Sequence, residues 1–340
     1  EARKYYQYCI EKNFKDHRVF ANYGTILKDL GKLKEAEIST RKAIEINPDF
    51  AIYHFNLGNI LKNLGKEKKA VAAFRKALEL KPEFTEAHNN LGNTLLDLGK
   101  FQDAELSTRK AIELKPDYAD ANSNLGKILK ELGQIQEAES YIRKAIELKP
   151  ELAEAHSNLG IILRDLGNLQ EAELSTRKAI ELKPDFADAY LNLGSILIYL
   201  DKLNEAEIYT RKAIEINPKF ASAYNDLGNI LRKKRNFYDA INQYKKAIKL
   251  NNELSIAKFG LIETKGHICD WKNLEYETNW LDKLGIEGAA INPLGLYYYE
   301  DNPLKQLQRA KKLYKEKYFK KLNNIYHSNN NKIRIGYFSS

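Results

Sequence analysis

The chain has 340 residues, of which 43% are hydrophobic and 30% charged, and no apolar stretch approaches the roughly 18 residues that a membrane helix needs. The formal net charge of +9 divides into +1 over residues 1–16, +3 over 17–254 and +5 over 255–340. Because basic and acidic residues are mixed along most of the chain, the sequence argues against a nucleic-acid partner and against membrane insertion.

The cysteines and the first residues suggest a compartment. Cys9 and Cys269 are the only cysteines and lie far apart in sequence, which is typical of a reducing compartment. The sequence starts at Glu1 and contains no methionine and no leader of the secretory kind. We therefore expect a fragment of a cytoplasmic protein. Residues 1–16 are expected to be the second helix of a truncated upstream repeat.

Residues 17–254 consist of seven 34-residue repeats. Proline recurs at the end of six of them, and Asn252 takes the next place in that series. Glycine, and twelve residues later alanine, recur in all seven. The prolines are Pro48, Pro82, Pro116, Pro150, Pro184 and Pro218. The glycines are Gly24, Gly58, Gly92, Gly126, Gly160, Gly194 and Gly228. Small residues at a fixed period predict close crossings between two antiparallel helices in each repeat, with proline in the turn to the next repeat.

A second glycine series predicts the turn inside each repeat. Gly31, Gly65, Gly99, Gly133 and Gly167 follow the first helices and are expected to end them. Asp201 and Arg235 stand in the same place in the last two repeats, where we expect less regular turns.

These Leu-Gly, Ala, Ala and Pro positions at a period of 34 resemble tetratricopeptide repeats. The resemblance implies an all-α, right-handed superhelical solenoid whose first helices line a long inner groove. Partner proteins or polypeptide substrates would lie in that groove, and self-association stays open.

One polar residue recurs on the predicted inner surface. We name this series the asparagine ladder: Asn22, Asn56, Asn90, Asn124, Asn158, Asn192 and, in the seventh place, Asp226. An amide offers two N–H donors and an acceptor oxygen, so it can hold a peptide backbone whatever the peptide's side chains are. The alternative is that these residues brace neighbouring helices. Asparagine is a mediocre helix former, which favours peptide binding.

Other sites are less well supported. The residues just before the ladder are not basic, which disfavours a clamp for a C-terminal carboxylate. His54, His88 and His156 stand where later repeats have tyrosine, so we interpret them as packing residues and expect no metal site. No catalytic constellation and no cofactor site can be defended in this chain.

Residues 255–331 are expected to form a helical cap and linker. Leu261 predicts an eighth first helix that ends near His267, followed by a helix over about 272–284. A further helix would start at Asn302-Pro303, with Leu304, Leu307, Ala310 and Tyr314 on one face and solvated basic residues, including Arg309 and Lys312, on the other. Residues 332–340 alternate like a strand.

The order of repeats, Cys269-Asp270-Trp271, Asn292-Pro293-Leu294 and the strand at 333–338 resembles bacterial and SPINDLY-type members of the protein O-GlcNAc transferase family. The resemblance implies that residues 332–340 are the first strand of a truncated Rossmann-like glycosyltransferase domain, and that a UDP-sugar donor serves the parent family. The repeats would then recruit polypeptide substrates, and this segment alone would be non-catalytic. The alternative is a free-standing scaffold or adaptor without an enzymatic role.

Overall fold

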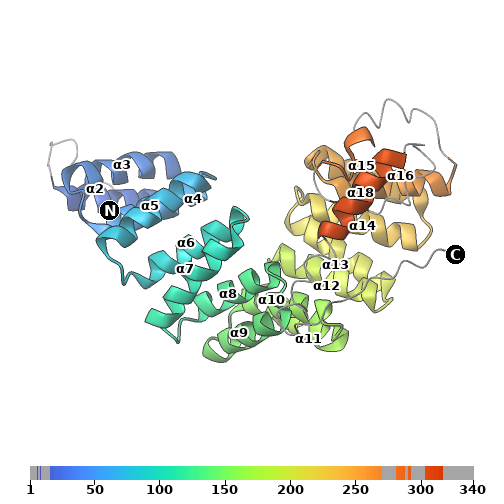
Figure 1. Cartoon of the computed structure of the whole chain (residues 1–340), viewed down its shortest axis with the longest axis horizontal. Helices are drawn as coiled ribbons and strands as arrows, with labels where there is room; N and C mark the ends of the chain where they lie inside the picture. Colours follow the sequence, from blue (N-terminus) through green and yellow to red (C-terminus); the bar gives the residue numbers. More distant parts are fainter. Residues whose placement is uncertain are drawn as a thin grey trace. The chain divides into compact units, whose positions relative to one another are not determined.

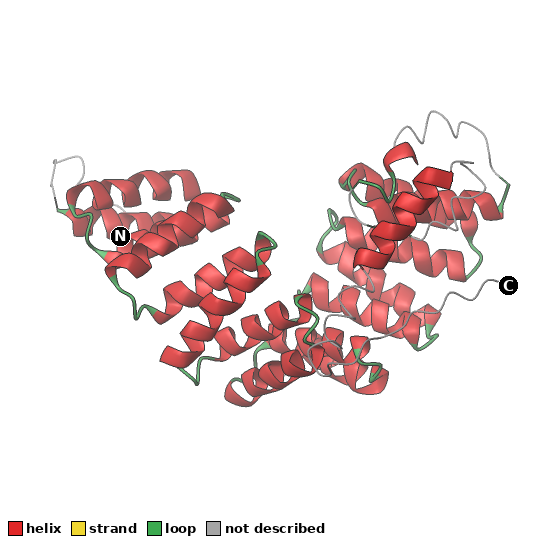
Figure 2. Ribbon diagram, in the orientation of Figure 1, coloured by secondary structure: helices red, strands yellow, loops and turns green. Residues whose placement is uncertain are grey.

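The computed structural model describes Tyr6, Tyr8 and residues 16–269, 281–287, 290–291 and 303–316. Within these residues the chain is helical and contains no strand (Figure 2). None of the helices found there has the length and apolarity required to cross a bilayer. The strand predicted over 332–340, most of the helix predicted over 272–284 and most of residues 1–16 lie outside the described part.

Helices of two lengths alternate along the repeats, as the 34-residue period predicts. The first helices have 13 residues: α2 (His17–Asp29), α4 (Ala51–Asn63), α6 (Thr85–Asp97), α8 (Ala119–Glu131), α10 (Ala153–Asp165), α12 (Ala187–Tyr199) and α14 (Ala221–Lys233). The second helices have 14: α3 (Leu33–Ile46), α5 (Glu67–Leu80), α7 (Phe101–Leu114), α9 (Ile135–Leu148), α11 (Leu169–Leu182), α13 (Leu203–Ile216) and α15 (Phe237–Leu250). The chain is therefore an all-α repeat solenoid.

The chain forms two compact units. Unit 1 contains Glu1–Leu132 and Gln136–Pro150, and unit 2 contains Gly133–Ile135 and Glu151–Ser340. Unit 1 holds the first four helix pairs and unit 2 the last three, which Figure 1 labels along the chain. Unit 2 also holds α16 (Ser255–His267), the 3-10 helix η1 (Leu281–Lys283) and α18 (Pro303–Tyr314).

The small residues lie where the two helices of a repeat cross. Both alanine series, which start at Ala36 and Ala43, are fully buried in all seven repeats. A Cβ placed on Gly58 would come within 2.5 Å of the ring of Phe74, and one on Gly228 within 2.7 Å of the ring of Tyr244. The helices therefore approach too closely for any side chain larger than hydrogen at these glycines. This confirms the role predicted for them.

The turns inside the repeats share one geometry. The glycines from Gly31 to Gly167 have φ between +68° and +87°, and each ends its helix as predicted. Asp201 and Arg235 adopt the same left-handed conformation, with φ of +56° and +61°. The turn at Arg235 is closed by hydrogen bonds from its N–H to Arg232 O at 2.9 Å and from Asn236 N–H to Leu231 O at 2.9 Å. The expectation of less regular turns there was wrong, because the flanking helices impose the conformation although neither residue favours it.

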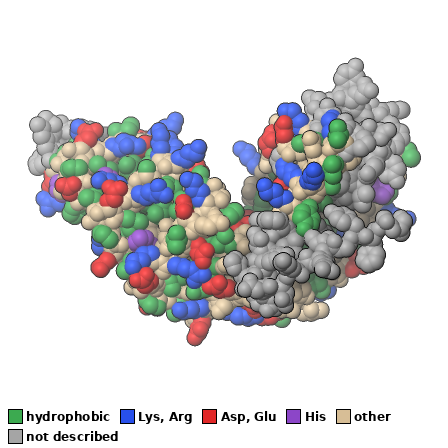
Figure 3. Space-filling view, in the orientation of Figure 1, with side chains coloured by type: hydrophobic (Ala, Val, Ile, Leu, Met, Phe, Trp, Pro, Cys, Tyr) green, Lys and Arg blue, Asp and Glu red, His purple; other side chains and the backbone are tan. Residues whose placement is uncertain are grey.

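Ion pairs join successive second helices within each unit. Glu173 accepts hydrogen bonds from Arg177 in the same helix and from Lys202 at the start of the next second helix. Glu207 accepts hydrogen bonds from Arg211 in the same helix and from Lys234, the residue that caps the end of the first helix α14. Acidic and basic side chains are accordingly interspersed on the face of unit 1 that Figure 3 shows. Single exposed pairs of this kind contribute little, on the order of 0.5 kcal/mol each.

The last described helices confirm two predictions from the sequence, but the face of the final helix that was predicted to be solvated is partly buried. α16 ends at His267 and α18 starts at Pro303, as expected. Arg309, however, is fully buried, and its guanidinium donates to the carbonyl oxygens of Leu284 at 2.8 Å and Leu281 at 3.0 Å. On the opposite face Leu304 is 73% exposed. The basic face of this helix packs against η1 because its long side chains reach backbone carbonyl oxygens there, so the predicted solvated face was wrong at Arg309.

Candidate functional site

The asparagine ladder lies on the first helices of both units. All its members are half-buried except Asn22, which is exposed. Most residues immediately before the ladder point into the core: Asn89, Ser157 and Asn225 are each no more than 4% exposed. Their burial explains why this preceding position carries no basic residue.

In unit 1 the ladder is part of a chain of amides. Asn124 Nδ2 donates to Asn89 Oδ1 at 2.9 Å, Asn89 Nδ2 to Asn90 Oδ1 at 3.3 Å, and Asn90 Nδ2 to Asn59 Oδ1 at 2.8 Å. These bonds connect α8, α6 and α4. Asn22 donates to the hydroxyl of Tyr6 at 3.1 Å. The ladder therefore braces neighbouring repeats, which is the role that the sequence left as an alternative to peptide binding.

In unit 2 the partners of the ladder are more varied. Asn192 Nδ2 donates to the hydroxyl of Ser157 at 3.0 Å. Nδ2 of Asn158 is buried and has no hydrogen-bond partner among the described residues. Asp226 accepts a hydrogen bond from Asn225 Nδ2 at 3.1 Å. A buried, unsatisfied donor costs about 1–3 kcal/mol, so retention of Asn158 has no evident benefit for stability.

Bracing leaves hydrogen-bonding capacity unused. The bonds above engage one N–H of Asn90, Asn124 and Asn192, and an amide has a second N–H and an oxygen with two lone pairs. A bond to the preceding repeat fixes the side chain's rotamer, so binding of a ligand would order it no further. Bracing and peptide binding are therefore compatible.

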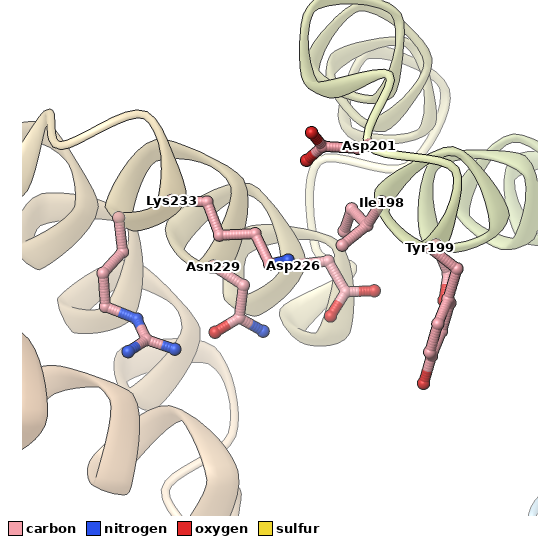
Figure 4. A pocket seen from close by; sticks show the side chains of 8 residues that line it. Ile198, Tyr199, Asp201, Asp226, Asn229 and Lys233 are labelled. Atoms are coloured by element: carbon pink, nitrogen blue, oxygen red, sulfur yellow. The ribbon is translucent and has the colours of Figure 1, made fainter.

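A pocket surrounds the last member of the ladder. It has a volume of about 610 Å³, and Ile198, Tyr199, Asp226 and Asn229 are among its lining residues. Figure 4 shows Asp226 and Asn229 on one helix, α14, opposite Tyr199 at the end of α12. Burial raises the pKa of Asp226 from 3.8 to about 6, although the hydrogen bond from Asn225 and the charge of Arg164 oppose the rise. This position therefore holds a carboxylate in an environment that disfavours its charge.

Basic residues on the same helices were missed by the sequence reasoning, which considered only the residue before the ladder. Six residues after the ladder stand Lys28, Lys62, Lys130, Arg164 and Arg232 in five of the seven repeats. Arg164 donates to Ser195 at 3.1 Å and pairs with Asp165 at 2.8 Å. The sequence contains the signal for this series, because the basic residues recur with the same 34-residue period as the ladder and always stand six positions after it.

The histidines have a structural role that explains their spacing. Nε2 of His54 lies 2.7 Å from the carbonyl oxygen of Pro48, and Nε2 of His88 lies 2.8 Å from that of Pro82. At the equivalent place Tyr224 donates its hydroxyl proton to Pro218 O at 3.3 Å. A polar side chain six residues after each of these three prolines thus braces the turn between repeats. No cluster of metal-ligating side chains occurs within the described residues.

Helix pairs of constant length, crossing at small residues and repeated without a sheet, define a helical-hairpin repeat solenoid. Models of the tetratricopeptide repeat match residues 17–50, 40–72, 85–118, 117–185, 187–220 and 209–249, and a model described as TPR repeat matches residues 58–99. The chain belongs to the tetratricopeptide-repeat proteins.

Solved structures share this fold. A chain of the APC/C hetero-tetramer Cut9–Hcn1 is 18% identical with a TM-score of 0.66, and the match covers 73% of this chain and 49% of that one. A tetratricopeptide repeat protein from Parabacteroides merdae is 21% identical with a TM-score of 0.61, over 73% and 98% of the two chains. YrrB, described as a TPR protein with an unusual peptide-binding site, is 31% identical over 54% of this chain and 95% of its own, with a TM-score of 0.41. No curated protein matches the chain.

Proposed function

We propose that the first-helix surface binds an extended polypeptide and that the asparagine ladder holds the backbone of that polypeptide. The observation that carries the proposal is the unused capacity of amides already oriented by the preceding repeat, at Asn90, Asn124 and Asn192. An amide that recurs once per repeat would bind main-chain N–H and C=O groups at regular intervals. The proposed contact tolerates many peptide sequences.

The retention of Asn56 and Asn158 supports the same role. Neither makes a side-chain hydrogen bond within the described part of the chain, and the donor of Asn158 is buried without a partner. Asparagine in the middle of a helix costs roughly 0.5 kcal/mol relative to alanine. These two positions therefore carry asparagine at a small expense in stability, which a ligand contact would explain.

The two unbonded asparagines also allow a clean experiment. The double variant Asn56→Ala/Asn158→Ala removes ladder amides without removing a hydrogen bond inside the protein, so we expect stability that is equal to or higher than that of the wild type. Peptide binding should be about tenfold weaker, on the order of 1 kcal/mol. Fluorescence anisotropy with a labelled, unstructured peptide measures the affinity. Gln102→Ala/Gln170→Ala is the matched control, because both glutamines are exposed on second helices. Equal affinity in the two double variants would contradict the proposal.

A narrower hypothesis concerns the identity of the bound polypeptides. The resemblance to O-GlcNAc transferases predicts that they are substrates of a glycosyltransferase, and it depends on Cys269-Asp270-Trp271 and residues 333–338. Cys269, a free and exposed thiol, is the member of this set that the structure describes. Incubation of the natural protein with labelled UDP-GlcNAc and a bound Ser/Thr-rich peptide tests the hypothesis. Transfer of label to the peptide supports it, and peptide binding without transfer supports the free-standing scaffold.

A further inference from the structure

The turn that ends α14 differs in charge from every other turn of its kind. It reads Arg232-Lys233-Lys234-Arg235, whereas the first turn reads Lys28-Asp29-Leu30-Gly31. At the position of Lys233 the other repeats carry Asp29, Asn63, Asp97, Glu131, Asp165 and Tyr199. At the position of Arg235 they carry Asp201 or one of five glycines. The last repeat has thus replaced an acid and a glycine by two cations.

In earlier repeats the acid neutralises the basic residue beside it. Lys130 pairs with Glu131 at 2.8 Å, and Arg164 pairs with Asp165 at 2.8 Å. In the last repeat Arg232 pairs with Glu263 of α16 at 2.7 Å, and Lys234 pairs with Glu207 at 2.7 Å. Lys233 and Arg235 make no ion pair within the described residues, and both are exposed. Two cations at this turn are therefore outside any ion pair, although Lys233 also lines the pocket that contains Asp201 and Asp226.

These two cations line a pocket that has an aromatic wall. The pocket has a volume of about 540 Å³ and is lined by Arg232, Lys233, Arg235, Phe237 and His267. The rings of Phe237 and His267 stack with their centroids 5.4 Å apart and their planes inclined by 14°. Nε of Arg232 is buried without a hydrogen-bond partner among the described residues. The lining contains three cationic side chains and no carboxylate.

Arg235 also occupies a backbone conformation that disfavours it. Its φ of +61° lies in the left-handed region, where five other repeats use glycine, and a non-glycine residue there costs about 1 kcal/mol. Arg235 therefore lowers the stability of this turn, and it forms no ion pair within the described residues that would offset the loss. A ligand that its guanidinium contacts would explain its presence.

We infer that this pocket binds carboxylate side chains of an acidic segment in the partner polypeptide. The inference rests on the proposed function and names the partner's charge. Lys233 and Arg235 would each pair with one carboxylate, and the stacked rings would contact the methylene groups beside it. A nucleic acid fits less well, because duplex binders make about 6–10 phosphate contacts and only two unpaired cations lie here.

Binding of two peptides to the full chain tests the inference. One peptide is unstructured and rich in Asp and Glu, and its counterpart has Asn and Gln at the same places. We expect the acidic peptide to bind about tenfold more tightly at low salt, and this advantage to shrink as salt is added.

Single variants show which residues cause the tighter binding of the acidic peptide. Lys233→Asp restores the acid found in other repeats and should abolish the advantage of the acidic peptide. Lys219→Asp makes the same charge change in an exposed turn of unit 2, where other repeats have Asp or Glu, and should leave the advantage intact. Arg235→Gly restores the residue of five other turns, so it should fold normally and reduce the advantage about threefold.

The outcomes separate the two proposals. About tenfold weaker binding of both peptides in Asn56→Ala/Asn158→Ala, with Lys233→Asp affecting the acidic peptide alone, supports both. Equal affinity of the wild-type chain for the two peptides overturns the acidic pocket and leaves the ladder standing. A single-stranded RNA that binds more tightly than the acidic peptide, and loses that affinity in Lys233→Asp, would overturn the inference in favour of a nucleic-acid partner.

Discussion

The asparagine ladder occupies equivalent positions of the first helices in both units, but the hydrogen-bond partners and charges of its members differ between the units. In unit 1 the ladder belongs to a continuous chain of neutral amides, from Asn124 to Asn59. In unit 2 it has a hydroxyl partner at Asn192, an unpartnered amide at Asn158 and a carboxylate at Asp226. Because the small residues at the crossings set the geometry within each repeat, a ladder position can change charge without changing the fold.

The largest predicted loss of stability comes from substitution of the glycines at the helix crossings, and it should be similar in the two units. Gly58→Val and Gly228→Val would each push a side chain into a buried ring, of Phe74 or Tyr244, that lies within 3 Å of the added Cβ. We expect each variant to lose at least about 3 kcal/mol of unfolding free energy. Urea unfolding followed by circular dichroism measures the loss. A much smaller loss in one unit would show that its helices can separate, and would break the comparison.

The next effect should distinguish the units. Asp226→Asn introduces the residue of the other six repeats and removes a carboxylate whose pKa burial raises to about 6. Because the folded state binds this proton more tightly than the unfolded state, the stabilisation is complete below about pH 4 and is lost as the pH rises through about 6. At pH 7 the charged group costs about 3 kcal/mol, so the variant should be more stable by roughly that amount.

The pH dependence provides the control for Asp226→Asn. The urea concentration at the unfolding midpoint of the wild type should decrease as the pH is raised from 4 to 7. The midpoint of the variant should decrease less over the same range. Asn192→Asp places a carboxylate at the preceding ladder position, so the same pH dependence should appear or increase there. Parallel curves for wild type and Asp226→Asn would show that Asp226 is solvated and that the environment of the two ladders is alike.

A smaller effect should separate bracing from unbonded members of the ladder. Asn90→Ala and Asn192→Ala each remove a side-chain hydrogen bond to the preceding repeat, so each should lower the unfolding free energy by about 1 kcal/mol. Asn56→Ala removes no such bond in the described structure and is the matched control. Thermal unfolding of the three variants measures the difference. Equal values would mean that the hydrogen bonds between repeats do not brace them.

The smallest effect concerns the turns. Asp201→Gly and Arg235→Gly relieve a left-handed conformation and should each raise stability by about 0.5–1 kcal/mol. Gly99→Ala and Gly167→Ala make the reverse change in ordinary turns and should lower it by a similar amount. Amide hydrogen exchange of the turn residues gives a local measurement. A loss of stability in Arg235→Gly would show that its side chain supports the turn.

Most of the fold could be predicted because each repeat is a local structure. Gly58 and Ala70 mark the crossing of the two helices of a repeat and Pro82 marks the following turn, and the period repeats this information along residues 17–254. The candidate site could be predicted only as a series of residue types. The partners of Asn124 and Asn192 lie 35 residues away on another helix, so nothing in their local sequence specified them.

The sequence by itself determined the helical pairs, the turn positions and the residues that form the ladder. The reason is that small residues at a strict period allow the two helices of each repeat to pack closely in one register only. Tertiary structure alone decided which polar atoms are already bonded, that Arg309 is buried, and that the turn at Arg235 keeps the geometry of glycine. The first two outcomes depend on distances between elements that are not neighbours in sequence, and the third depends on how the two helices that flank the turn pack. Burial and packing there override the preference of a single residue for solvent or for a backbone conformation.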